Sequence, residues 1–136
     1  MNVVLDTNVL LVSISSKSIY RPILDALIAG KFHLVLSNDI LSEYTEVIER
    51  KAGAVVSNNI AEMLLNLDNL NKVEVYFEWK LIDKDPDDNK YVDAAIVGAA
   101  DFIVSSDQHF NILKSVEFPK VNVIGIDEFM HLIARK

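Results

Sequence analysis

The sequence predicts an α/β fold built around a parallel β-sheet. Short apolar runs, too brief for helices, recur along the chain at 2–5, 33–36 and 102–106. Such continuous apolar runs are typical of strands that are covered on both faces, as in parallel sheets. Segments with apolar residues at helical spacing lie between them, and an aspartate follows two of the runs, Asp6 and Asp107. The alternation predicts helices packed on a sheet, and the aspartates predict polar groups at one of its edges.

The composition predicts one compact domain over residues 1–136. Hydrophobic residues make up 51% of the chain, with only 4 glycines and 3 prolines, which argues against disorder. No apolar run approaches the roughly 20 residues that span a bilayer, and there is no cysteine, so we expect a cytoplasmic protein without a membrane segment or disulfides. The net charge of −7 argues against broad electrostatic binding of nucleic acid. Carboxylates gathered around a divalent cation would nevertheless not repel such a substrate.

The elements of the first half follow from turn and capping signals. After the strand at 2–5 comes a polar loop at 13–20. Arg21 and Pro22 open a helix that Gly30 closes, because proline is tolerated in the first turn and glycine favours the position after a helix. The same signals predict the strand 33–36 and a helix over 40–50 after caps at 37–39. A further helix within 52–70 begins after Gly53 or after the cluster 57–59. A strand at 73–77 follows it.

The second half begins with a helix after the sequence DPDD. Pro86 fits the first helical position, which puts Asp85 at the N-cap. A projection at 100° per residue puts Asp88 within about 15° of the centre of the apolar stripe, whereas Asp87 and Asp93 lie roughly 110° and 130° away and should point outward. An unpaired inward carboxylate is unfavourable, so Asp88 needs hydrogen-bond donors or a metal. The strand 102–106, a last strand at 121–126 and a final helix at 128–136 complete the chain.

Two acids of the first half have a structural and a functional interpretation. In the helix 40–50, Glu46 and Glu49 lie roughly 150° from the centre of the apolar stripe and should face solvent. Glu43 lies roughly 90° away, at the margin of the stripe, where it either is solvated or reaches the edge of the core. Asp6 either caps the segment that follows the first strand or supplies a ligand-binding group at the end of that strand. Both alternatives remain open for Glu43 and for Asp6.

Four acids, Asp6, Glu43, Asp88 and Asp107, can meet at the carboxyl edge of one sheet. Clustered carboxylates cannot all stay ionised without a cation, and all-oxygen ligands suit Mg²⁺ or Mn²⁺. Such a site lowers the pKa of a bound water and stabilises developing charge on a phosphate. Hydrolysis of a phosphodiester uses this chemistry without another side-chain nucleophile. The chain agrees, because it has no cysteine, no GxSxG, no Walker-type glycine loop and no GxGxxG.

Four motifs occur in order along the chain: LDTNVL at 5–10, S-x-x-x-x-x-E at 37–43, DPDDNKYVDAA at 85–95 and IVSSD at 103–107. Over nearly its whole length the chain thereby resembles the PIN domain family. More narrowly, it is similar to the stand-alone bacterial and archaeal branch of VapC-type ribonucleases, described as toxins of toxin–antitoxin pairs. The resemblance implies a three-layer α/β/α fold with a central parallel sheet and an endoribonuclease that depends on Mg²⁺ or Mn²⁺ and cleaves RNA.

The resemblance also implies the residues of the site. The family's four acids fall on Asp6, Glu43, Asp88 and Asp107, which would ligate the metal. Asp85 could ligate in place of Asp88, because DPDD offers three acids where many members have one. Further polar residues near the substrate or behind the ligands would be Asn8, Ser37 and Ser105 or Ser106. Families of this kind commonly form homodimers and are inhibited by a protein antitoxin that covers the site.

Other classes of protein remain as alternatives. An aspartate-based phosphohydrolase of the haloacid dehalogenase type would have a second aspartate two residues after the first, but position 8 is Asn8. A receiver-type phosphoacceptor would need an acidic pair beside the first strand, where Asp6 is the one acid. A PIN-like scaffold that binds RNA or a protein without cutting is the third alternative. The presence of all four acids argues against loss of the site.

Overall fold

The computed structural model describes residues 1–82, 88–106, 110, 113 and 119–135. Within these residues, five strands form one parallel sheet in the order β3-β2-β1-β4-β5. The strands are β1 (Asn2–Leu5), β2 (His33–Leu36), β3 (Leu70–Lys72), β4 (Phe102–Val104) and β5 (Val123–Ile124). The helices are α1 (Thr7–Ser13), α2 (Arg21–Ile28), α3 (Asn38–Ala52), α4 (Ala54–Leu65), α5 (Asn89–Val97) and α6 (Ile126–Ala134).

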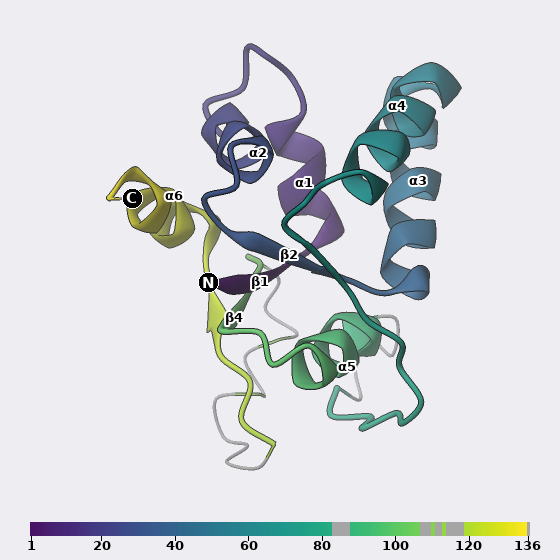
Figure 1. The fold of residues 1–136 in the computed structure, drawn as a ribbon, viewed down its shortest axis with the longest axis vertical. Helices are drawn as coiled ribbons and strands as arrows, with labels where there is room; N and C mark the ends of the chain where they lie inside the picture. The colour runs from purple at the N-terminus through teal and green to yellow at the C-terminus, as the bar shows by residue number, and fades with distance from the viewer. Residues whose placement is uncertain (83–87, 107–109, 111–112, 114–118, 136) are drawn as a thin grey trace.

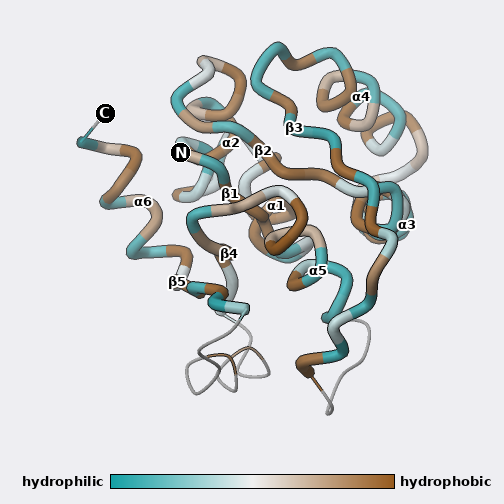
Figure 2. The backbone as a smooth tube through the Cα atoms, turned by 60° about the horizontal axis from the view of Figure 1, so that its bottom comes forward, coloured by the Kyte–Doolittle hydropathy of each residue, from teal (hydrophilic) through white to brown (hydrophobic). Residues whose placement is uncertain are grey.

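Helices cover both faces of the sheet, which confirms the predicted three-layer α/β/α fold with a central parallel sheet. Helices α1 and α2 lie on one side of the sheet and α5 lies on the other, while α6 packs beside α2 (Figure 1). In β1, Val3, Val4 and Leu5 have no exposed surface, as expected for a strand covered on both faces. Brown and teal alternate along α6, the pattern of a helix with one face on the core (Figure 2). No helix of the described residues is long and apolar enough to cross a membrane.

Two glycines shape the helical layers. At the end of α5, a Cβ on Gly98 would lie 2.6 Å from Cγ1 of Val35 in β2, so glycine lets this helix approach the sheet closely. Gly53 has a φ of 94° and separates α3 from α4, which confirms one of the two predicted break points. The two helices then fold back along each other, and the Ser57 hydroxyl of α4 donates to Thr45 O of α3 at 2.8 Å.

The third strand lies three residues earlier than predicted. Its pairing with β2 ends where Val73 N–H donates to Leu36 O at 2.9 Å. The alternating residues 73–77 instead begin a segment that leaves the sheet, in which Tyr76 and Phe77 are 88% and 61% exposed. Alternation of polar and apolar residues was the signal for a strand. Here Val73 is buried and Val75 half-buried, whereas Glu74, Tyr76 and Phe77 are exposed outside the sheet.

This segment covers one side of α5, and the prediction that Asp93 points outward is therefore wrong. Asp93 is only 4% exposed, and its carboxylate accepts a hydrogen bond from Trp79 N–H at 3.0 Å. Burial raises the pKa of the Asp93 carboxyl, the Trp79 N–H lowers it, and the charge of Glu78 raises it. The Asn89 side chain fixes the same segment, since its amide donates to Ile82 O and its oxygen accepts from Ile82 N–H, both at 2.9 Å.

The last helices begin at other residues than predicted. Helix α5 begins at Asn89 with Asp88 at the N-cap, three residues after the predicted start, and the predicted cap Asp85 lies outside the described residues. Helix α6 begins at Ile126 after the N-cap Gly125, so Asp127 lies in the first turn. There its negative charge is favoured by the helix dipole.

Candidate functional site

Asp6 stands at the carboxyl edge of the sheet, directly after β1. Leu5 pairs with Val104 of β4, so the next residue of each strand, Asp6 and Ser105, meet at this edge. The Asp6 N–H donates to Val104 O at 3.1 Å, and the Ser105 hydroxyl donates to Asp6 Oδ2 at 2.7 Å. Asp6 occupies the N-cap position of α1, yet its side chain makes no capping hydrogen bond. Capping therefore does not explain this carboxylate, and of its two interpretations the geometry favours a group presented at the strand end.

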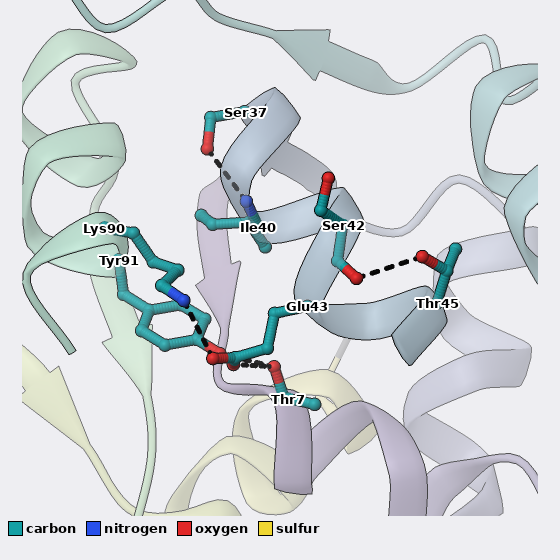
Figure 3. Close-up of polar contacts among 8 residues, drawn as sticks. All are labelled: Thr7, Ser37, Ile40, Ser42, Glu43, Thr45, Lys90 and Tyr91. Carbon is teal, nitrogen blue, oxygen red and sulfur yellow. Dashed lines mark hydrogen bonds and ion pairs between the residues drawn. The ribbon is translucent and has the colours of Figure 1, made fainter. Parts of the chain in front are cut away.

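Glu43 extends from α3 into a hydrogen-bonded cluster with α1 and α5 (Figure 3). Its Oε1 accepts from Lys90 Nζ at 2.9 Å, and its Oε2 accepts from the Thr7 hydroxyl at 2.5 Å. The Tyr91 hydroxyl also donates to Oε2 and lies in close contact with the Thr7 hydroxyl. Glu46 is exposed, as its position on the helix predicted, and Glu43 is half-buried, which favours the second of its two interpretations, a side chain that reaches the edge of the core. Three side chains from two helices, α1 and α5, thus hold the Glu43 carboxylate in one orientation.

Asp88 lies at the start of α5 and is 9% exposed, which confirms the prediction that it faces inward. It occupies the N-cap position, but its side chain makes no capping hydrogen bond. Lys90 and Tyr91, two and three residues further on, both contact Glu43. The start of α5 therefore brings Asp88 to the side of the sheet edge where Glu43 lies.

Asp107, the fourth predicted acid, lies outside the described residues, as does Asp85. The strand that precedes Asp107 is described, and it runs parallel to β1 as its direct neighbour. This confirms that the two aspartate-bearing strands end at the same edge of the sheet.

Tyr44 links the two sides of this edge. It is fully buried, and its hydroxyl donates to Leu5 O at 2.5 Å, the carbonyl directly before Asp6. Burial raises the pKa of Tyr44 well above its ordinary value, and the carboxylates of Asp6 and Glu43 raise it further. Tyr44 consequently remains a neutral hydrogen-bond donor that fixes the end of β1.

The donors at this edge are carboxylate and hydroxyl oxygens, the type that Mg²⁺ and Mn²⁺ prefer. Among the described residues, no three histidines or acids lie close enough together to hold an ion. The chemistry of the donors therefore fits such a metal, while a complete ligand set would draw on Asp107 beyond the described part of the chain. Glu43 already has a positive partner, the ammonium group of Lys90.

The predicted polar neighbours take different positions. Asn8 and Ser106 line a pocket of about 370 Å³ together with Asp6. Ser105 contacts Asp6 directly. Ser37 is buried and acts as the N-cap of α3, where its hydroxyl oxygen accepts from Ile40 N–H at 3.2 Å, so its contribution is to start the helix that carries Glu43.

Sequence reasoning missed the three groups that hold Glu43. Thr7 follows the first acid directly, and a hydroxyl in the first turn of a helix was a weak signal for a polar contact. Lys90 was the stronger signal, because a cation within an acidic motif suggests an ion pair. Tyr91 belongs to the core, with 1% exposure, and a buried tyrosine hydroxyl needs a hydrogen-bond partner.

The model of the PIN domain family matches residues 2–109, which is most of the chain. The matched range contains all four predicted acids, Asp6, Glu43, Asp88 and Asp107. No curated protein matches the chain.

Proposed function

Because the chain belongs to the PIN domain family, whose members are generally nucleases that use divalent metals, we propose that it is a metal-dependent endoribonuclease that hydrolyses RNA phosphodiester bonds. The observation that carries the proposal is the Asp6 carboxylate. It stands at a strand end, it makes no capping hydrogen bond, and it is held by Ser105 of the neighbouring strand. A carboxylate fixed in this way at the carboxyl edge of a parallel sheet is suited to ligand binding.

The proposed ligands of Mg²⁺ or Mn²⁺ are Asp6, Glu43, Asp88 and Asp107, with Asp85 as the alternative to Asp88. When bound, the ion would supply a more acidic water and would offset charge on the reacting phosphate. The chain's other residues orient these ligands. Ser105 holds Asp6, Thr7 and Tyr91 hold Glu43, and Asn8 and Ser106 flank Asp6 where a substrate would approach.

We further propose that residues 1–136 act as one nuclease domain. The family match ends at residue 109, but β5 pairs in parallel with β4 through Ile103 and Val123. Helix α6 packs beside α2, and its Phe129 makes edge-to-face ring contacts with Phe32 and Phe102, with centroids 5.1 and 6.0 Å apart. The residues after the match thus complete the same sheet and core.

The narrower proposal is that the protein is the toxin of a toxin–antitoxin pair. Its support is the order of the motifs at 5–10, 37–43, 85–95 and 103–107, which resembles the VapC-type branch. It would then act on cytoplasmic RNA, form homodimers, and be inhibited by a protein antitoxin that covers the acidic edge. A small open reading frame directly upstream of the gene, whose product co-purifies with this protein and suppresses its cleavage, is the expected finding. A solitary gene would argue against this narrower role.

The test of the activity is cleavage of single-stranded RNA with Mn²⁺ or Mg²⁺. Asp6→Asn and Asp107→Asn should each abolish it, because each removes a charged ligand from the proposed site. Asp68→Asn is the matched control, since this exposed aspartate between α4 and β3 lies outside the site, and it should cleave like the unmodified protein. Metal-dependent cleavage that survives in both site variants would refute the assignment.

One observation favours the second candidate, a scaffold that binds RNA or a protein without cutting. Lys90, Thr7 and Tyr91 together donate hydrogen bonds to both oxygens of Glu43, so side chains of the protein itself account for the position of this carboxylate. Titration calorimetry with Mn²⁺ separates the two candidates. Binding that is lost in Asp6→Asn supports the nuclease, whereas no binding to the unmodified protein supports the scaffold.

A further inference from the structure

A pocket of about 370 Å³ opens directly beside Asp6. Its apolar walls are Val9 and Val12 of α1 and Ile126 of α6. The volume lies at the lower end of what small-ligand sites have, so it suits a single ring system better than a folded element of another protein. The pocket is therefore continuous with the proposed site but differs from it in being largely apolar.

Tyr20, just before α2, forms the aromatic wall of this pocket. Its hydroxyl donates to the Asp127 carboxylate at 3.2 Å, and its N–H donates to the Ser18 hydroxyl oxygen at 3.1 Å. Arg21 braces the same loop, because its guanidinium donates to Ile14 O at 2.6 Å. Tyr20 is thus held at its hydroxyl and at its backbone, and its ring offers a surface for stacking.

Asn8 and Ser106 add polar groups to the pocket next to Asp6. An asparagine amide both donates and accepts, and so does a serine hydroxyl, which matches the mixed donors and acceptors on the edge of a nucleobase. A phosphate is a poor occupant, because the pocket adjoins the Asp6 carboxylate in a chain of net charge −7. The ligand that fits is flat, neutral and aromatic, with a polar edge.

We propose that this pocket binds one unpaired nucleobase of the RNA, that of the nucleotide next to the scissile phosphate. The base stacks on Tyr20 while its edge meets Asn8 and Ser106, so that its own phosphate lies at Asp6. The inference rests on the proposed function, because it takes the acidic edge to be where RNA is cut. A base can enter the pocket only when it is not paired, and the pocket would therefore make the enzyme selective for single-stranded RNA.

The pocket can be filled without touching the acids. Val12 is 40% exposed at the pocket, so Val12→Phe should occupy the space of the base. Val55→Phe is the matched control, since Val55 is 73% exposed on α4 and does not line the pocket. Tyr20→Ala removes the stacking wall, whereas Tyr20→Phe keeps the ring and loses only the hydrogen bond to Asp127. Thermal unfolding of each variant establishes that it is folded.

The assay is the affinity for a short, fluorescently labelled single-stranded oligoribonucleotide and for its duplex. All proteins carry Asp6→Asn so that the RNA stays intact. Val12→Phe and Tyr20→Ala should each weaken single-strand binding about tenfold, which is the order of the loss of one stacked base. Tyr20→Phe, which keeps the stacking ring, should bind more tightly than Tyr20→Ala. Val55→Phe should bind like its parent, and duplex binding should be weak in all five proteins.

Unchanged single-strand binding in both Val12→Phe and Tyr20→Ala would overturn the pocket, as would an equal loss for single strand and duplex. These outcomes are independent of the nuclease assignment. If Asp6→Asn abolishes cleavage while the pocket variants bind RNA normally, the proposed function is supported and the base pocket is refuted. If the unmodified protein cleaves no RNA but the pocket variants lose single-strand binding, the base pocket is supported and the protein is a scaffold that binds RNA without cutting it.

Discussion

Lys90 offers the sharpest test of the site, because it and a metal would compete for the same carboxylate oxygen. Its ammonium lies 2.9 Å from Oε1 of Glu43, with side chains 22% and 26% exposed. If Glu43 is a ligand, binding of Mn²⁺ must displace or share this contact. Replacing Lys90 by methionine removes the charge and keeps most of the apolar stem. The variant should therefore be less stable without metal and should bind Mn²⁺ more tightly.

The magnitude follows from the geometry of the pair. At 2.9 Å and an effective dielectric constant of about 20, the attraction is about 6 kcal/mol before any opposing term. Desolvation and side-chain ordering offset most of it, and hydrogen bonds to charged groups are worth a net of about 1.5 to 3 kcal/mol. We expect Lys90→Met to lower the metal-free free energy of unfolding by about this amount. If the unmodified protein must break this pair when it binds Mn²⁺, Lys90→Met avoids that loss. The affinity of the variant for Mn²⁺ should then be roughly tenfold to hundredfold higher.

The two measurements are urea unfolding in EDTA and titration calorimetry with Mn²⁺. Lys90→Arg keeps the charge beside Glu43 and should bind the metal like the unmodified protein. Lys51→Met is the control for net charge, because it removes one positive charge from an exposed position at the end of α3. Weaker Mn²⁺ binding by Lys90→Met than by Lys51→Met would refute the reasoning, since it would mean that Lys90 supports the metal site.

Two further predictions concern α5 and its surroundings. Burial raises the folded-state pKa of Asp93 above its ordinary 3.8, so wild-type stability should fall as the pH rises from about 4 through that raised pKa. Asp93→Asn should consequently be more stable than wild type by urea unfolding at about pH 7, with the gap closing toward pH 4, and a gap of the opposite sign would contradict this. Gly98→Ala should be destabilising by about 1 to 3 kcal/mol, because its Cβ would lie 2.6 Å from Val35, and Val35→Ala in the same chain should restore part of the loss. Gly125→Ala, whose Cβ would have no heavy atom within 4 Å, should change the unfolding free energy little, and equal effects at the two glycines would refute the packing argument.

The central strands could be predicted from the sequence, because a strand that is buried on both faces is a continuous run of apolar residues. The apolar runs 2–5 and 33–36 coincide with β1 and β2, whose last three residues are fully buried. The edge strands β3 and β5 were predicted less well. An edge strand lacks a neighbour on one side, so fewer constraints act on its sequence, and the alternation in 73–77 describes a half-exposed segment beside α5 equally well.

The site could be predicted in part, for a related reason. Helical projection found that Asp88 faces inward and Glu46 outward, because it compares residues of one helix with the apolar stripe of that helix. It failed at Asp93, because the covering segment comes from elsewhere in the chain and buries a second side of α5. The partners of Glu43 lie 36 to 48 positions away in the sequence, and no local pattern specifies such contacts.

The net charge of −7 remained an objection to an RNA-binding function, and the contacts at Glu43 bear on it. The Lys90 ammonium is directed at the Glu43 carboxylate, in a groove beside α3 that Asp39, Glu46 and Arg50 also line. A divalent ion bound at Glu43 would add positive charge to this edge of the sheet. The acidic edge would then become attractive to a phosphate only after the metal is bound. A base pocket of neutral side chains beside Asp6 suits such an order, since stacking on Tyr20 does not depend on the charge of the protein.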